Sequence, residues 1–261
     1  MLPKPEGAYG ILARFYDELM LEALDYSQWF AALRHLLAKE GKPLSPHHRV
    51  LDLACGTGLM TEQMAQAGYQ VIGADLSEEM LAVAEQRLRR AGHSVPLLRA
   101  DMRDFDLGIT FDCVFCLCDS LNYIEDSTQL PEVFASVARA LKPNGVFVFD
   151  VNSEYKLSQI YGSNTYAEIR DGWSYIWENT YDPEQGICQM DLAFYIQDPD
   201  GRFTQYRERH YEIALDHEEI VRALASTGFS LLGVYGDDFV TSPGSDTERW
   251  TYLAVKGNVG S

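Results

Sequence analysis

The sequence is short of positive charge. Its 261 residues include 21 Lys and Arg against 39 Asp and Glu, which gives a formal net charge of −18. A surface of that sign repels a phosphate backbone, so the composition argues against nucleic acid as a partner. Long apolar runs are also lacking, because the longest are strand-sized and interrupted by charge, so no membrane span is expected. Residues 1–10 lack the basic and apolar regions of a signal peptide, which favours a cytoplasmic location.

Cysteine and histidine are too few, or wrongly spaced, for a disulfide framework or a metal site. Five cysteines are an odd number, and a cytoplasmic compartment keeps thiols reduced. Cys113, Cys116 and Cys118 lie in one expected strand, 112–118, where alternation puts Cys113 on the face opposite the other two. The six histidines form no H-E-x-x-H motif or paired ligand spacing. The sequence therefore predicts no metal.

An apolar strand that runs into two glycines is the most informative stretch. It reads V-L-D-L-A-C-G-T-G from Val50 to Gly58. Because Gly56 and Gly58 lack Cβ atoms, the backbone can turn sharply there and approach a small molecule at the carboxyl end of the strand. Asp52 lies inside the apolar strand, where a carboxylate without a partner is costly. The pattern predicts a ligand-binding turn, although the glycines alone also fit a tight turn without a ligand.

The next two expected strands also end in an aspartate. They cover 69–74 and 95–100, and Asp75 and Asp101 follow them. The carboxyl ends of parallel strands meet at one edge of an open sheet, where ligands bind, and an acid after the second strand can accept both hydroxyls of a ribose. We therefore expect these two acids and Asp52 to surround one ligand that contains a nucleoside and cationic groups.

A dinucleotide fits this pattern less well. Thr61 occupies the third glycine position of G-x-G-x-x-G, and an acidic crevice repels a pyrophosphate. A nicotinamide-dependent oxidoreductase stays open as an alternative, with NAD binding as its signature.

Strands and helices alternate from Arg49 to Asp150, which predicts a doubly wound α/β sheet. Glycine, proline and capping residues bound the expected helices, which cover residues 14–21, 27–40, 59–67, 78–91, 130–141 and 217–227. Further strands are expected at 141–150, 229–235 and 250–256.

The pattern changes after Asn152. Three strands are expected at 173–181, 187–197 and 202–215, joined by turns, and the middle one alternates apolar and more polar residues as a sheet with one buried face does. These strands predict an antiparallel β insertion over 153–215. The expected domains are therefore 1–152 together with 216–261, interrupted by this insertion.

Five motifs resemble, in order, those of the class I S-adenosylmethionine-dependent methyltransferases, in particular small bacterial members with a β-rich insertion after the fifth strand. The first is the glycine-rich stretch already described. The others are G-A-D-L-S-E-E-M-L from Gly73, R-A-D-M-R-D-F from Arg99, C-D-S-L-N-Y-I from Cys118 and L-K-P-N-G-V-F-V-F-D from Leu141. The resemblance implies a mostly parallel, seven-stranded Rossmann-like sheet with an antiparallel last strand, and S-adenosyl-L-methionine as cofactor.

The resemblance also implies roles for single residues. Asp52 and the 54–58 backbone would contact the methionine part of the cofactor, and Asp75 would bind its ribose. Leu76 and Met80 would flank the adenine, whose amino group would donate to Asp101. The expected cofactor-binding residues are Tyr9, Tyr16, Asp52, Ala54, Cys55, Gly56, Gly58, Asp75, Leu76, Met80, Asp101, Met102 and Cys118.

The amino-terminal residues A-Y-G-I-L-A-R-F-Y-D-E-L-M, from Ala8 to Met20, resemble a segment that folds over the cofactor in these members. This is why Tyr9 and Tyr16 are included. Aromatics at this spacing also fit the apolar face of a docking helix, and that alternative stays open.

The sequence gives fewer indications of the catalytic groups. Methyl transfer from a sulfonium is an in-line displacement that depends mostly on positioning and exclusion of water. Where the acceptor arrives protonated, the candidate general base is His210, with Glu208 on the same strand face; a structural histidine is the alternative. Arg207, Arg209 and Arg249 fit either an acceptor carboxylate or salt bridges.

The predicted function is transfer of a methyl group from S-adenosylmethionine to a small-molecule acceptor. The loop after the fourth strand lacks the N-P-P-Y type of sequence that the resemblance would require for methylation of nucleic-acid bases. The insertion is expected to act as a lid over the acceptor or as a homodimer contact. A non-catalytic protein that binds the cofactor, or its demethylated product, to regulate a partner is the alternative.

Overall fold

A computed structural model describes residues 9–257 of the chain. Most of the segment 1–10, on which the signal-peptide argument rests, therefore lies outside the described residues. Within them, no helix is both long and apolar enough to cross a membrane.

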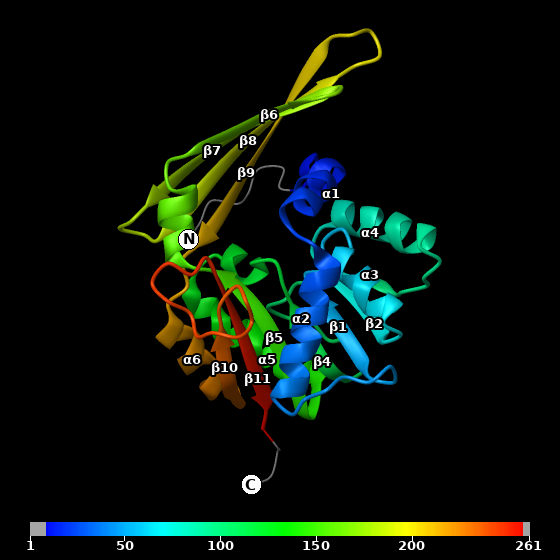
Figure 1. Cartoon of the computed structure of the whole chain (residues 1–261), viewed down its shortest axis with the longest axis vertical. Coiled ribbons are helices and arrows are strands. Elements are labelled where there is room, and N and C mark those ends of the chain that lie inside the picture. Colours follow the sequence, from blue (N-terminus) through cyan, green and yellow to red (C-terminus); the bar gives the residue numbers. More distant parts are fainter. Residues whose placement is uncertain (1–8, 258–261) are drawn as a thin grey trace.

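The main body is built on a seven-stranded sheet with the order β10-β11-β5-β4-β1-β2-β3. All neighbouring pairs are parallel except the two that involve β11, so the prediction of a mostly parallel sheet with an antiparallel last strand is confirmed. The strands are β1 (Arg49–Leu53), β2 (Gln70–Asp75), β3 (Leu97–Arg99), β4 (Phe111–Cys116), β5 (Leu141–Asn152), β10 (Phe229–Tyr235) and β11 (Arg249–Lys256). Successive strands run outward in opposite directions from β1 and β4, so the sheet has its switch point between these two (Figure 1).

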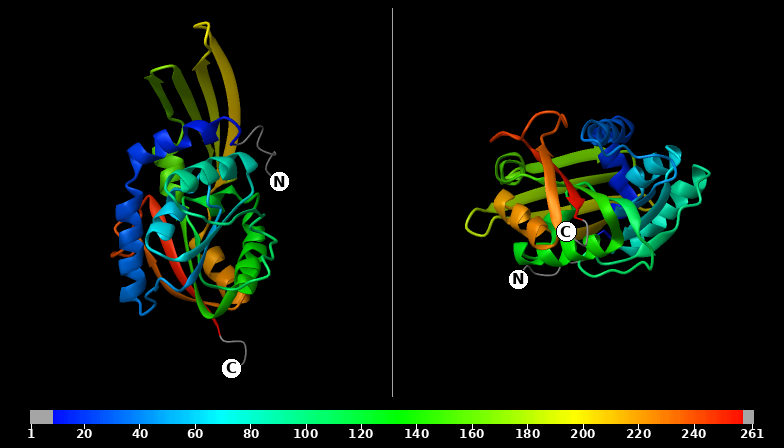
Figure 2. Two further views of the ribbon diagram at one scale, coloured as in Figure 1. Left: turned by 90° about the vertical axis from the view of Figure 1, so that its right-hand side faces the viewer. Right: turned by 90° about the horizontal axis from the view of Figure 1, so that it is seen from below.

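All six expected helices form, with ends within two residues of the prediction: α1 (Leu12–Ala23), α2 (Tyr26–Lys39), α3 (Leu59–Gln66), α4 (Glu78–Arg90), α5 (Leu130–Ala140) and α6 (His217–Ser226). Side chains of Asp25, Ser77 and Asp216 cap the amino ends of α2, α4 and α6. Helices α2 and α3 pack on one face of the sheet, and α5 and α6 on the other (Figure 2). The result is a three-layer α/β domain.

The insertion forms a separate antiparallel sheet with the order β6-β7-β8-β9. Its strands are β6 (Thr165–Arg170), β7 (Trp173–Asp182), β8 (Ile187–Gln197) and β9 (Phe203–Ile213). The prediction of three strands was wrong because β6 was missed. This edge strand is exposed at every residue except Arg170, so it carries no alternation of apolar and polar residues.

One face of the insertion sheet packs on α1, which lies at the carboxyl edge of the main sheet (Figure 1). Phe15 of α1 lies 4.3 Å from the ring of Trp173 and 5.6 Å from that of Phe194, measured between ring centroids. The amino-terminal helix is therefore held by the insertion, and the two close over the same end of the main domain.

The cysteines in and after β4 show how far side chains alternate between the two faces of the sheet. Cys113 and Cys116 pack into cores on opposite faces of the sheet, as expected. Strand β4 ends at Cys116, however, and Cys118 adopts a left-handed conformation with φ 59° and packs on the same side as Cys113. The expected strand was two residues too long, so the predicted side for Cys118 was wrong.

Candidate functional site

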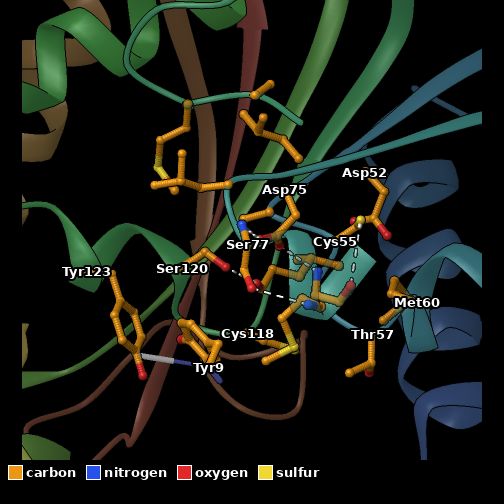
Figure 3. A pocket seen from close by; sticks show the side chains of 18 of the residues that line it. Tyr9, Asp52, Cys55, Thr57, Met60, Asp75, Ser77, Cys118, Ser120 and Tyr123 are labelled. Carbon is orange, nitrogen blue, oxygen red and sulfur yellow. Dashed lines mark hydrogen bonds between the residues drawn. The ribbon is translucent and has the colours of Figure 1, made fainter. Parts of the chain in front are cut away.

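A cavity of about 360 Å³ lies at the carboxyl edge of the sheet, beside the switch point. This is within the range of small-ligand pockets, roughly 300–1,000 Å³. Figure 3 shows side chains from widely separated segments around it. Every expected cofactor-binding residue lines this cavity except Gly58; the lining members are Tyr9, Tyr16, Asp52, Ala54, Cys55, Gly56, Asp75, Leu76, Met80, Asp101, Met102 and Cys118.

The two glycines of the turn have different surroundings. Gly56 has φ +54°, and no heavy atom outside Gly56 and its two chain neighbours lies within 4 Å of the position that a Cβ would occupy, so its backbone is open to a close approach. Gly58, with φ +79°, starts α3, and a Cβ there would lie 3.1 Å from the Cβ of Ala84 on α4. Gly58 therefore permits helix packing beside the cavity, whereas Gly56 forms its wall.

Asp75 connects the first two strand ends. Its carboxylate accepts the backbone N–H of Gly56 at 2.7 Å and that of Ser77 at 2.9 Å (Figure 3). Burial raises the pKa of Asp75, and these hydrogen bonds act in the opposite direction. Each carboxylate oxygen keeps lone pairs that can accept ligand hydroxyls.

Asp52 is buried below the turn, where its side chain accepts the hydroxyl of Thr61 at 2.5 Å. Burial raises the pKa of Asp52 to about 7, against the effect of the Thr61 hydrogen bond, and the nearby Asp75 adds to the rise. Two carboxyl groups so close together favour a cationic ligand. The donor set thus fits a cofactor that carries ammonium and sulfonium charges.

Part of the cavity lining is apolar. It includes Leu76, Met80, Met102 and Ile124, and Leu76 is 55% exposed although its side chain is fully apolar. A flat ring would cover such a surface, which fits the adenine of the cofactor.

The carboxylate of Asp101, which the sequence predicts to accept from the adenine, is already bound by a neighbouring side chain. The Nε and Nη2 atoms of Arg103 bind its two carboxylate oxygens at 2.6–3.1 Å and lower its pKa. A ligand amino group would have to share this carboxylate with Arg103, which itself lines the cavity.

Helix α1 is fastened to the glycine turn by a polar network. Thr57 donates its hydroxyl to Asp17 at 2.6 Å, and Arg87 of α4 pairs with the same carboxylate. Arg87 also donates to the backbone oxygen of Thr57 at 3.0 Å. The amino-terminal segment is therefore anchored at the cavity and places Tyr9 and Tyr16 in its wall.

Four tyrosines, Tyr9, Tyr16, Tyr26 and Tyr123, form one side of the cavity. A tyrosine hydroxyl is ordinarily neutral near pH 7, and burial raises the pKa of all four further from that range. Figure 3 shows Tyr9 beside Tyr123, and their ring centroids lie 5.9 Å apart.

Arg249 stabilises the backbone behind this tyrosine side. Its guanidinium binds Asp119 at 3.0 Å, pairs with the buried Asp150, and lies 5.5 Å from the ring centroid of Trp29. Asp119, like Cys118 before it, has a left-handed conformation, with φ 52°. Arg249 therefore holds two successive strained residues at the cavity wall and is already paired, which disfavours its alternative role as a ligand for an acceptor carboxylate.

His210 lies next to the cavity and does not line it. It is 1% exposed, with its ring centroid 4.9 Å from that of Tyr9 and 6.1 Å from that of Tyr123. Its Nε2 atom is 3.2 Å from the carboxylate of Glu208. Arg207 and Arg209 are exposed on the other side of β9 and do not line the cavity, so they are not placed to bind an acceptor there.

Several lining residues were not singled out from the sequence: Tyr26, Met60, Arg103, Ser120, Tyr123, Ile124 and Glu125. Arg103 and four of the others lie inside quoted motifs or directly after one, so the motifs could have indicated them. Tyr26 and Met60 are buried helix residues whose spacing is that of an ordinary core face.

Comparisons with known proteins agree with this geometry. Residues 50–145 match the family model described as a methyltransferase domain. The chain is 34% identical to the provisionally named methyltransferase YqeM of Bacillus subtilis (strain 168) over 249 residues, which are 95% of this chain and 97% of that protein. It is 26% identical, over 98% of this chain and 95% of the relative, to a dTDP-3-amino-3,6-dideoxy-alpha-D-glucopyranose N,N-dimethyltransferase of Streptomyces fradiae.

A solved structure is similar over nearly the whole chain. The crystal structure of an S-adenosylmethionine-dependent methyltransferase from Clostridium acetobutylicum ATCC 824 superposes with a TM-score of 0.84 at 33% identity, covering 96% of this chain and 99% of that one. The motifs, the cavity and these relatives lead to one identification: the chain is a class I S-adenosylmethionine-dependent methyltransferase, an enzyme that transfers the methyl group of this cofactor.

Proposed function

We propose that the cofactor occupies the cavity with its ribose on Asp75, its adenine between Leu76 and Met102, and its methionine part near Asp52 and Gly56. The open Cβ position of Gly56 and the exposed face of Leu76 support this orientation. It directs the sulfonium toward the tyrosine side of the cavity. Bound there, the cofactor supplies an activated methyl group, and the protein's contribution is to position the acceptor and exclude water.

The acceptor in this proposal is a small molecule whose reacting atom is an uncharged amine nitrogen. The observation that carries it is the tyrosine side itself, because it presents four neutral aromatic rings at the cavity. Transfer moves positive charge from the sulfonium to the nitrogen, and tyrosine faces stabilise such a charge. Burial is the main cause of the raised pKa values of Tyr9 and Tyr123, and the negative charge of nearby Asp119 adds to both; that charge also favours a developing cation at this side.

A relative supports the same class of acceptor. The Streptomyces fradiae protein, which is similar over 98% of this chain, is named for dimethylation of the amino group of a nucleotide-linked sugar. The insertion packs on α1 and on the segment before it, which supply Tyr9 and Tyr16 to the cavity wall. We therefore propose that residues 153–215 act as a lid on the domain formed by 1–152 and 216–261. A homodimer contact is the other role that we assign to the insertion.

We also propose a cytoplasmic location. All five cysteines are free thiols, four of them buried, as in proteins of a reducing compartment.

Turnover with a matched panel of amines, phenols and carboxylates tests this proposal. The purified chain, cofactor and each acceptor are incubated, and the demethylated cofactor is quantified by mass spectrometry. Methylation of amines, with phenols and carboxylates at background, is expected. Turnover confined to carboxylates or phenols would contradict the amine assignment.

A further inference from the structure

Glu208 of β9 binds three backbone N–H groups near the amino end of the chain. Its carboxylate accepts from Tyr9 at 3.1 Å, from Leu12 at 3.0 Å and from Ile11. The partners are 196 to 199 residues apart in the sequence, and Glu208 is only 4% exposed. We call residues 9–12 the strap, because they connect Tyr9, which lines the cavity, to the first residue of α1.

The chemistry of this contact is specific to a carboxylate. The first N–H groups of a helix have no partner within the helix, and Ile11, the residue directly before α1, supplies no side-chain cap. Glu208 provides that cap from another part of the fold, and a negative charge is favourable at this end of a helix. Burial raises the pKa of Glu208, but hydrogen bonds from His210 and from the strap outweigh it, so the pKa lies below its ordinary value.

The strap sets the position of a cavity residue. Tyr9 has φ 64°, a left-handed conformation that a residue with a bulky side chain rarely adopts. This conformation places its ring 5.9 Å from that of Tyr123 and 4.9 Å from that of His210. A residue keeps such a conformation only when contacts with its surroundings stabilise it. For Tyr9, one such contact is the hydrogen bond from its own backbone N–H to Glu208.

We propose that Glu208 is a positioning residue for methyl transfer: by clamping the strap, it fixes Tyr9 against Tyr123 at the tyrosine side of the cavity. The inference rests on the proposed placement of the acceptor at that side, and it does not depend on the acceptor being an amine. His210 supports the clamp, because its Nε2 atom lies 3.2 Å from the same carboxylate and orients it.

Two variants of Glu208 test the clamp, and a third variant is the control. Glu208→Gln keeps the size of the side chain but leaves one carbonyl oxygen to accept three N–H groups. Glu208→Asp keeps the charge and shortens the reach, and serves if the first variant does not fold. Glu178→Gln is the control, since it makes the same change at an exposed position of β7, a strand of the same sheet that does not pair with β9.

Hydrogen exchange of the Ile11 and Leu12 amides and steady-state kinetics are measured for each. In Glu208→Gln, exchange of these amides should rise at least about tenfold and kcat should fall by roughly ten- to a hundredfold, as misplacement of a positioned group predicts. The Glu178→Gln protein should match the unmodified chain in both measurements. Unchanged amide exchange in a folded Glu208→Gln protein would refute the clamp, whichever acceptor the enzyme uses.

A double-mutant cycle separates positioning from general stabilisation. If Glu208 acts through Tyr9, then Glu208→Gln should lower kcat/KM by less than about twofold in a Tyr9→Ala background. An equal loss in both backgrounds would show that Glu208 does not act through Tyr9. The two proposals can fail separately. If the unmodified chain methylates no amine, the proposed acceptor is contradicted; if the amides of the strap still exchange faster in Glu208→Gln, the clamp remains supported.

Discussion

The backbone N–H of Gly56 donates to the carboxylate of Asp75 across 2.7 Å, which ties the end of the first strand to the end of the second. One acid thereby holds the glycine turn in place and offers its remaining lone pairs to the cavity. The loop that approaches the ligand and the group that binds it are parts of one rigid unit.

Asp75→Ala should weaken S-adenosylmethionine binding. Losing one hydrogen bond to a charged acceptor costs about 1.5–3 kcal/mol, so a rise in Kd of at least roughly 10- to 150-fold is expected. Isothermal titration calorimetry measures it, with Glu85→Ala, an exposed change on α4, as the control. Equal affinity in a folded Asp75→Ala protein would remove the ribose assignment.

Cofactor binding should depend on pH through Asp52. Burial raises the pKa of Asp52 from 3.8 to about 7, so in this range the ligand-free fold keeps a proton that the unfolded chain has lost. The free energy of unfolding contributed by Asp52 therefore falls as pH rises from about 4 to 7. A cationic cofactor favours the ionised carboxylate, so its affinity should rise with pH, by up to about tenfold per unit, and level off above about pH 7.

Calorimetry in two buffers with different ionisation enthalpies measures the proton released on binding. Release approaching one proton is expected at pH 6, and almost none at pH 8.5. Asp52→Asn should abolish the dependence, because an amide does not titrate in this range. If the unmodified chain binds S-adenosylmethionine with equal affinity from pH 5.5 to 8, the proposed contact between ionised Asp52 and the cofactor is contradicted.

Arg249→Met should strongly destabilise the protein. It leaves Asp150 buried without its charge partner, and breaking a buried pair in this way typically costs about 3–5 kcal/mol. Arg209→Met, which removes an exposed pair with Asp191, should cost less than about 1 kcal/mol. Urea denaturation compares the two, and similar losses would show that the Arg249 cluster is not a structural anchor.

His210→Gln should leave the shape of the pH–rate profile unchanged. The side-chain amide can still donate to Glu208, and His210 does not line the cavity. His210→Phe cannot donate and should lower kcat along with amide protection in the strap. Loss of an ionisation near pH 6–7 from the kcat/KM profile of His210→Gln would instead show that His210 acts as the general base.

Much of the fold could be predicted because its signals are local. The alternation of apolar strands with capped helices located the elements of the main domain, and Gly56 and the strand-end acids located the cavity. Strand β6 was missed because an exposed edge strand has no buried face to leave a pattern in the sequence.

The site could be predicted only where its residues belong to motifs. Tyr123 lies in the quoted segment after the fourth strand, but its partner Tyr9 reaches it through a left-handed backbone that no local pattern specifies. For Glu208, the sequence indicated only part of its role. Its spacing from His210 correctly predicted that the two side chains share a strand face, but nothing in the sequence predicted that this face contacts the strap.

The sequence by itself determined the sheet, its helices and the turn at Gly56, because backbone conformation and the burial of one face depend on residues close together in the chain. Only the tertiary structure decided that Arg249 is paired with Asp119 and Asp150, and that Glu208 holds residues about 197 positions earlier. Such contacts depend on how complete elements pack, and a charged side chain finds its partner only once the surrounding layers have excluded water from it.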